Sequence, residues 1–333
     1  MNPPPLPLDL LAEVQSHAHY QEVDYARLAI EIGPERLACR LQEQMAVYQR
    51  AHRRMRNPLR KALHLLYRKG IPFGLFCLGQ LEKCRQLARN PQWTEREVFL
   101  PKLPPAFDGY RILQLSDFHF DYTPELAGIL KERIAPHAFD LCVITGDYRG
   151  EEYGPYEESL AELEKVRPVL GDQVYAILGN HDCVELLLEF PRMNIRSLYN
   201  QAVWLERGGE RLLLAGIDDS HGFSTWDFAP IRPQLREAET AILLAHTPEI
   251  FREAAAEGYH LMLSGHTHGG QLCLPGGHPV LTHTHNTPRA FTAGAWQYRD
   301  LQGYTSRGAG TSTIDCRLNC PGELTLHILR RAP

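Results

Sequence analysis

Hydrophobic and polar positions follow one pattern over the first hundred residues and another over the rest of the chain. In the first part, apolar residues recur at three- and four-residue spacing, which predicts helices over 34–55, 58–67 and 73–88. A break between the last two is expected at Gly70 and Pro72, because both residues disfavour helix interiors. This part carries no evident catalytic chemistry.

In the second part, short apolar runs end in polar loops and are followed by helical segments, a pattern typical of α/β proteins with mixed sheets. The runs predicted as strands are 111–115, 140–145, 173–178, 203–206, 211–217, 240–245 and 260–264, with further strand patterns at 303–306 and 323–329. We therefore predict a basic, helix-rich N-terminal region over residues 1–100 and a catalytic α/β domain over residues 101–333.

Charge changes this picture for one segment. Residues 49–89 hold eleven Lys or Arg and one acid, Glu82, for a net charge of +10, while the rest of the chain carries −15. Such asymmetry indicates an anionic partner. The segment is either a solvated basic face packed on the main domain or an amphipathic element that meets anionic lipid or a lipid-like substrate. No nucleic-acid-binding module is recognisable, so nucleic acid is disfavoured.

Cysteine usage and the apolar runs set the expected compartment. The eight cysteines show no Cys-x2-Cys spacing, which favours a reducing compartment. Residues 1–5 lack the features of a signal peptide, and the longest apolar run, 70–79, is too short to span a bilayer. We expect a cytoplasmic protein, either free or attached peripherally to the inner membrane face.

The run Leu178-Gly179-Asn180-His181-Asp182 is the most informative stretch for chemistry. It follows an apolar strand, and active sites of α/β sheets lie beyond such strand ends. Asn180 offers a metal ligand, His181 an imidazole for a reacting oxygen, and Asp182 a carboxylate to steady that imidazole. Alternatively, the same residues form a turn in which Asn180 or Asp182 caps a helix over 184–188.

Other strand ends repeat the pattern. The potential ligands found there are Asp117, His119, Asp147, Asn180, His181, His246, His266 and His268. Each pair is individually common, but their joint occurrence after apolar strands is not. Carboxylate and imidazole ligands without thiolate suit manganese, iron, zinc or cobalt, and a bridging carboxylate would allow two ions to lie close together.

In order along the chain, these motifs read Asp-x-His, Gly-Asp, Gly-Asn-His-Asp, an isolated His and Gly-His-x-His, and so resemble those of the calcineurin-like metallophosphoesterases. The resemblance implies a four-layer αββα sandwich and two divalent metal ions, manganese first among them. It implies one ion bound by Asp117, His119, Asp147 and His268, and a second bound by Asp147, Asn180, His246 and His266. It also implies that His181 is the catalytic histidine and that Asp182 orients it.

A closer likeness concerns Gly265–Gln271 and Ser306–Ser312, which resemble the bacterial branch of membrane-associated phosphodiesterases. That branch includes a pyrophosphatase that cleaves UDP-2,3-diacylglucosamine. Many members carry an N-terminal membrane-spanning segment, which a basic helical region replaces here. The likeness implies cleavage of a phosphodiester or pyrophosphate bond in a lipid-linked or nucleotide substrate.

Further polar residues compete for roles. Arg149 is a candidate phosphate ligand or a surface arginine, and Arg307 either lines the pocket or closes a turn. His283 and His285 repeat a His-x-His spacing without a preceding strand, and we assign them no metal. Two alternative functions remain open: a phosphomonoesterase acting on a protein or soluble nucleotide, and a non-catalytic scaffold.

Overall fold

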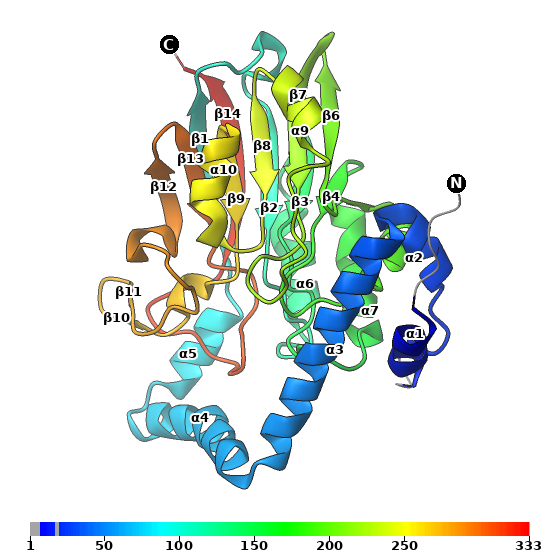
Figure 1. Cartoon of the computed structure of the whole chain (residues 1–333). Helices are drawn as coiled ribbons and strands as arrows, with labels where there is room; N and C mark the ends of the chain where they lie inside the picture. Colours follow the sequence, from blue (N-terminus) through cyan, green and yellow to red (C-terminus); the bar gives the residue numbers. More distant parts are fainter. Residues whose placement is uncertain (1–6, 17–19, 333) are drawn as a thin grey trace.

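The computed structural model describes residues 7–16 and 20–332, and its core is a pair of six-stranded sheets (Figure 1). The first sheet has the order β1-β14-β2-β3-β4-β5, and the second the order β12-β13-β9-β8-β7-β6. The strands of the first sheet are β1 (Gln92–Leu100), β14 (Glu323–Arg331), β2 (Arg111–Leu115), β3 (Leu141–Ile144), β4 (Val174–Ala176) and β5 (Arg196–Ser197). Those of the second are β12 (Gly294–Tyr298), β13 (Leu301–Thr305), β9 (Leu261–Ser264), β8 (Ala241–Leu244), β7 (Glu210–Gly216) and β6 (Gln201–Arg207).

Alternate residues of the central strands enter different cores, as the two-residue period of a strand requires. Ile112 of β2 and Ile242 of β8 face each other in the core between the sheets. Leu113 points the other way, into a core that the helices α6 (Leu126–Ile134) and α7 (Glu157–Val166) cover. Leu243 points into a third core, beneath α9 (Arg232–Glu237) and α10 (Phe251–Glu257). The predicted four-layer αββα sandwich is thereby confirmed.

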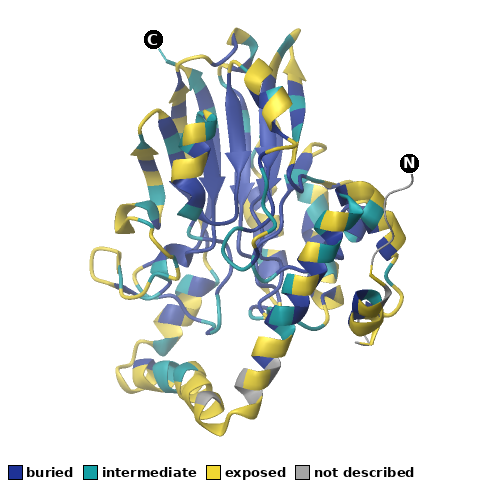
Figure 2. Ribbon diagram, viewed as in Figure 1, coloured by how far each residue is buried: buried dark blue, intermediate teal, exposed yellow. Residues whose placement is uncertain are grey.

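Five helices precede β1 in the described residues. They are α1 (Leu8–Gln15), α2 (Tyr25–Ile32), α3 (Pro34–Arg56), α4 (Pro58–Cys77) and α5 (Leu81–Ala88). The helices α1, α2 and α3 lie along one side of the sandwich, and α4 and α5 lie below it (Figure 1). Leu37 and Leu41 of α3 are fully buried in the same core as Leu113. By contrast, α4 lies at the lower end of the molecule with much of its surface exposed (Figure 2). No helix in the described ranges is long and apolar enough to cross a membrane.

Two features of the N-terminal region differ from the expectations. The predicted break at Gly70 and Pro72 is wrong, because α4 runs through both residues. One proline removes a single helical hydrogen bond, and the packing of the buried Leu75 holds the last turn in place. The strand β1 was not predicted; it pairs in parallel with β14 and so belongs to the first sheet. The division of the chain at residue 100 stays a prediction, and residues 1–5 lie outside the described ranges.

The remaining elements are short. A two-stranded hairpin, β10 (Cys273–Leu274) and β11 (His278–Pro279), projects below β12 in the view of Figure 1, and a one-turn helix α8 (Leu186–Glu189) follows β4. Single turns of 3-10 helix are η2 (Pro105–Phe107), η3 (Arg167–Val169), η4 (Phe190–Met193), η5 (Pro248–Ile250), η6 (His268–Gly270) and η7 (Arg289–Phe291). The helix α8 begins at Leu186 without a side-chain cap, so neither Asn180 nor Asp182 caps it.

Candidate metal centre

The candidate ligands follow parallel strands of both sheets and meet at one end of the sandwich. Asp117 and His119 come after β2, Asp147 after β3 and Asn180 after β4. From the second sheet, His246 follows β8, and the pair His266 and His268 follows β9. Because the carboxyl ends of parallel strands share one edge, loops far apart in the sequence converge there.

The backbone at these loops is unusual. Five of the seven candidate ligands have a positive φ: Asp117 (54°), His119 (44°), Asp147 (61°), His266 (71°) and His268 (49°). This left-handed region is uncommon for residues other than glycine and costs about 1–3 kcal/mol each, so the surrounding structure has to enforce it. Bonds between neighbouring loops do so: the Asp117 amide donates to the Gly146 carbonyl (2.9 Å) and the His119 amide to the Asp147 carbonyl (3.2 Å).

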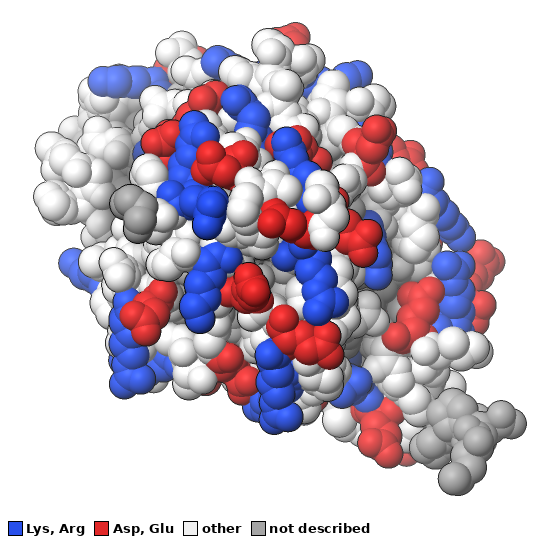
Figure 3. Space-filling model, turned by 90° about the horizontal axis from the view of Figure 1, so that it is seen from above, with Lys and Arg blue, Asp and Glu red and all other residues white. Residues whose placement is uncertain are grey.

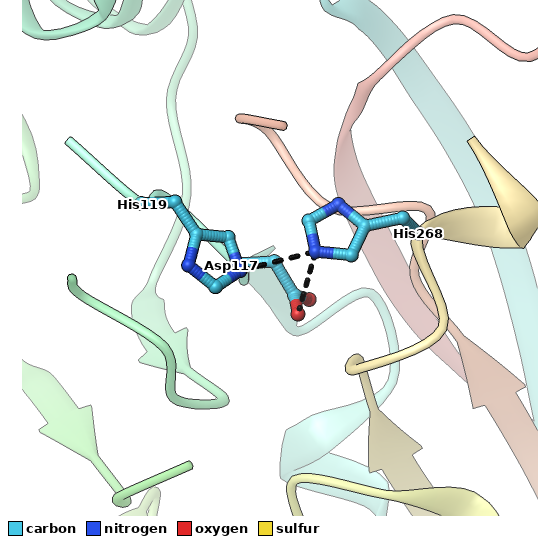
Figure 4. A group of neighbouring side chains, drawn as sticks. All are labelled: Asp117, His119 and His268. Atoms are coloured by element: carbon cyan, nitrogen blue, oxygen red, sulfur yellow. Dashed lines mark hydrogen bonds and ion pairs between the residues drawn. The ribbon is translucent and has the colours of Figure 1, made fainter. Parts of the chain in front are cut away.

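One group of ligand atoms is formed by Asp117, His119 and His268, whose atoms all lie within 4.8 Å of one another (Figure 4). The two imidazole Nε2 atoms are 3.1 Å apart, and Nε2 of His268 is 3.6 Å from an Asp117 oxygen. All three residues are buried. These atoms point toward one another and can surround one cation.

A second group is formed by Asp147, His246 and His266, with the same mutual limit of 4.8 Å. Asn180 joins it, since its Oδ1 lies 3.1 Å from His246 Nε2 and 2.8 Å from His266 Nδ1. Asp147 Oδ2 lies 3.2 Å from His246 Nε2 and also 3.5 Å from His119 Nε2 of the first group. Asp147 is therefore placed between the two groups.

The far side of each ring indicates which nitrogen faces the centre. Nδ1 of His119 lies 2.7 Å from the Arg149 carbonyl, and Nδ1 of His246 lies 2.7 Å from the Thr145 carbonyl. Nε2 of His266 likewise lies 2.8 Å from the His283 carbonyl. A ring that donates one N–H to a carbonyl directs the lone pair of its other nitrogen inward. Lone pairs then face the oxygens of Asp147 and Asn180, an arrangement that fits a divalent cation.

Burial and charge set the protonation of these groups. Burial lowers the pKa of His119 to about 4 and lowers the pKa of His266 and of His268 well below the ordinary value, which leaves these rings neutral. Burial opposes ionisation of Asp147, but the neighbouring imidazoles, His246 foremost, hold its pKa well below the ordinary range. Burial also lowers the pKa of His246, yet the Asp147 carboxylate raises it overall well above 6.5. A cation bound here has to displace that proton.

The turn after β4 places His181 and Asp182 differently from each other. Nδ1 of His181 lies 2.5 Å from the Gly150 carbonyl. The Asp182 carboxylate accepts from the backbone amides of Asp147 (2.7 Å), Tyr148 (3.0 Å) and Gly179 (2.8 Å). A carbonyl thus contacts the His181 ring, and the Asp182 carboxylate joins two loops. That Asp182 orients His181 stays a prediction.

The two arginines singled out in the sequence are also occupied elsewhere. Arg149 is buried, and its guanidinium donates to the carbonyls of His181 (2.7 Å), Gly154 (2.5 Å) and Glu152 (3.4 Å). Carbonyl oxygens accept three of its N–H groups, and a phosphate contact by Arg149 stays a prediction. Arg307 pairs with Glu323 at 2.6 Å, and whether it also lines the pocket or closes a turn stays a prediction.

The sequence analysis did not predict that side chains of α3 form hydrogen bonds to the turn that begins at Asp182. Arg40 donates to the Asp182 carbonyl (2.8 Å) and forms a fully buried ion pair with Asp218 (3.1 Å). Gln44 accepts from the Val184 amide (3.1 Å) and donates to the Glu185 carboxylate (2.9 Å). Gln42 and Glu43 lie between these two residues, and nothing in the sequence marks Arg40 and Gln44 as the buried ones, so only the fold reveals the contacts.

His221 is a second missed residue. Its Nδ1 lies 3.1 Å from a Glu249 oxygen, and its ring centroid is 4.2 Å from that of His266. The ring of His285 stacks on its other side at 5.1 Å. The signal in the sequence is its position just beyond Asp218 and Asp219, which follow the strand β7. His283 contacts the candidate ligand His266 through its carbonyl, and His285 stacks on His221. Neither imidazole belongs to one of the two groups of ligand atoms.

The candidate ligands open into a cavity of about 470 Å³. Its polar wall includes His119, Asp147, Asn180, His181, His221, His266 and His268. Its apolar wall includes Tyr67 and Ile71 of α4 and Leu272, Val280, Leu281 and Leu318 of the loops opposite. A phosphate ester that reaches the ligands therefore carries its substituent past apolar side chains.

Comparison with known proteins agrees with this geometry. The model of the calcineurin-like phosphoesterase family matches residues 110–270. A protein of Aquifex aeolicus named as a metallophosphoesterase is 31% identical over 239 residues, which cover 68% of this chain and 86% of that protein. The chain belongs to this family. It is a metal-dependent phosphoesterase, and members of the family bind divalent metals.

Two further relatives are of similar closeness. The protein named phosphodiesterase YaeI of Escherichia coli is 29% identical over 233 residues, covering 65% of this chain and 81% of that protein. The metallophosphoesterase YkuE of Bacillus subtilis is 27% identical over 248 residues, covering 71% and 85%. The residues matched by the family model, 110–270, include every candidate ligand from Asp117 to His268.

The substitution Gly265→Ala tests the packing of the ligand loops. A Cβ at this position would lie 2.3 Å from an Asp117 carboxylate oxygen and 1.9 Å from Ser116 Oγ, so it has to push the carboxylate aside. We expect Gly265→Ala to lose at least half of the metal bound by the wild type, measured by elemental analysis after manganese reconstitution. Gly128→Ala, where the added Cβ meets nothing within 4 Å, is the matched control and keeps the wild-type content.

Proposed function

We propose that the chain is a dinuclear phosphohydrolase that cleaves a phosphodiester or pyrophosphate bond. The observation that carries this proposal is the position of Asp147, whose Oδ2 lies within 3.5 Å of a histidine from each ligand group. A carboxylate so placed suits two cations held roughly 3.5–4 Å apart, the arrangement used for in-line displacement at phosphorus. The name of the relative YaeI, a phosphodiesterase, supports the choice of a diester.

The proposed ligand sets are those of the resemblance. One ion would be held by Asp117, His119, Asp147 and His268, and the other by Asp147, Asn180, His246 and His266. Divalent ions there, manganese by preference, would polarise the phosphoryl oxygens and lower the pKa of a water molecule. Three neutral imidazoles and one shared carboxylate match the preference of manganese, iron and zinc for nitrogen and oxygen ligands.

In this proposal His181 exchanges a proton with the departing oxygen. The Gly150 carbonyl occupies Nδ1, so Nε2 is the nitrogen left for the pocket that His181 lines. Arg149 fixes the backbone of the same residue by its bond to the His181 carbonyl. Asp182 acts as a positioning residue, because the three hydrogen bonds that its carboxylate accepts from backbone amides set the distance between the loops that carry Asp147 and Asn180.

We further propose a lipid-linked nucleotide such as UDP-2,3-diacylglucosamine as the substrate and an anionic membrane surface as the partner of residues 49–89. The apolar cavity wall, with Ile71, Leu272 and Leu318, offers contact surface to an acyl chain beside the reacting phosphate. The basic segment offers the opposite charge to anionic headgroups.

Two substitutions separate the roles of metal and histidine. We expect Asp147→Asn to abolish turnover and to lower the metal content at both sites, because the amide loses the charge that both ions share. We expect His181→Ala to keep both metals and to lower kcat by about 10²–10⁴-fold. Steady-state hydrolysis of bis(p-nitrophenyl) phosphate and elemental analysis measure both. Asp172→Asn, at an exposed site, is the control for the charge change, and wild-type turnover in His181→Ala would contradict the assigned role.

Hydrolysis of UDP-2,3-diacylglucosamine in detergent with Mn²⁺ tests the substrate. We expect metal-dependent release of UMP from this compound and little release from an unacylated UDP-sugar, since only the acylated compound fills the apolar wall. Diester hydrolysis without UMP release would keep the chemistry and remove the lipid. Hydrolysis of p-nitrophenyl phosphate alone, with no diester turnover, would instead favour the phosphomonoesterase.

A further inference from the structure

The exposed large apolar side chains of the described residues are concentrated in two segments of the chain. Among the described residues, twelve such side chains are exposed, and ten of them lie on or just after α4 or in the hairpin loop opposite. Those near α4 are Leu59, Leu63, Leu65, Leu66, Phe73, Phe76 and Leu78, and those of the loop are Leu274, Val280 and Leu281. Single exposed apolar residues are common on soluble proteins, but ten of them in two segments indicate a surface that binds a protein, a membrane or a ligand.

The helix α4 has two apolar faces with different neighbours. Tyr67, Ile71 and Leu75 are four residues apart and pack inward in a small cluster with Cys84 and Cys316, which holds the helix to the body of the protein. Leu59, Leu63, Leu66 and Phe73 are spaced by four, three and seven residues, which places them on one other face of the helix, and they are 56–69% exposed. We call these four residues the outer stripe of α4. The inward face is packed against the body of the protein, while the outer stripe is exposed to solvent.

The hairpin loop of residues 272–281, here called the rim hairpin, stands across the cavity from α4. Val280 and Leu281 line the cavity and are also 53% and 55% exposed, so they form its edge. Tyr67 and Ile71 of α4 line the same cavity. The entrance to the candidate metal centre therefore lies between two elements that each present apolar side chains outward.

The end of the molecule that carries α4 differs in charge from the opposite end. Seen from above, the far end of the strands mixes Lys and Arg with Asp and Glu (Figure 3). The helices α3 and α4 carry most of the segment with net charge +10, and exposed bases such as Arg53, Arg56, Lys61 and Lys69 lie along them. Apolar side chains for the acyl region together with bases for headgroup phosphates are the composition of interfacial helices.

We infer that the outer stripe of α4 and the rim hairpin form one docking surface for an anionic lipid bilayer, which places the cavity entrance at the headgroup layer. A substrate anchored in that bilayer then reaches the ligands without leaving the membrane surface. The inference rests on the proposed function only for that last step, because docking itself involves no chemistry. It adds the rim hairpin, far from residues 49–89 in sequence, to the membrane surface.

Vesicle co-sedimentation of the full chain tests the inference. We expect the wild type to bind vesicles of about three parts phosphatidylcholine to one part phosphatidylglycerol at least about tenfold more tightly than pure phosphatidylcholine in about 0.1 M salt. Phe73→Glu on α4 and Leu274→Glu on the rim hairpin should each weaken binding about tenfold or more. Ile30→Glu, at an apolar position 80% exposed on α2, is the matched control and should bind like the wild type.

Each contrary result has a definite meaning. Wild-type binding by Leu274→Glu would overturn the two-element surface, and equal binding to both vesicle types would overturn the anionic partner. Self-association that Phe73→Glu abolishes, without vesicle binding, would assign the surface to a second copy of the chain. Because Phe73 and Leu274 do not line the cavity, hydrolysis of bis(p-nitrophenyl) phosphate should continue in both variants. Failure of that hydrolysis in the wild type would contradict the proposed function while leaving the vesicle result intact.

Discussion

The Asp182 carboxylate is the constraint on which the centre depends. It accepts three backbone amides, from Gly179 in its own turn and from Asp147 and Tyr148 in the turn after β3. Burial and the nearby charge of Asp147 raise the pKa of Asp182 to about 6, and the three amides oppose that rise. By joining two strand ends, it brings Asp147 beside Asn180 and lets the His181 amide donate to Asp147 (3.0 Å). The left-handed backbone at Asp147 is held by the same contacts.

Strand ends and candidate ligands could be predicted because both follow from local patterns. The apolar runs before Asp117, Asp147 and His246 are strands, and the residues after them do converge. The partners of those residues could not be predicted in the same way. Whether Asp182 contacts the His181 ring or a distant amide depends on tertiary contacts between loops, and the same holds for the guanidinium of Arg149. The strand β1 was missed because its burial alternates only weakly, with exposed or half-exposed positions from Gln92 to Glu97.

The N-terminal helices serve the sandwich in two ways. Arg40 and Gln44 of α3 bond to the backbone of Asp182 and Val184, so this helix supports the turn that carries Asn180. The outer stripe of α4, in contrast, contributes nothing to the core and leaves its apolar surface outward. Both helices show apolar residues spaced among basic ones in the sequence. Such periodicity predicts which face of a helix is apolar, but it does not tell whether that face is buried or exposed.

Anomalous diffraction from crystals of the manganese-reconstituted chain is the most direct test of the central claim, that Asp147 joins two metal sites. The account predicts two peaks per chain, roughly 3.5–4 Å apart, each within about 2.3 Å of an Asp147 oxygen. One peak beside Asp117, His119 and His268 and the other beside Asn180, His246 and His266 would complete the arrangement. A single peak, or a second peak out of reach of Asp147, would contradict it.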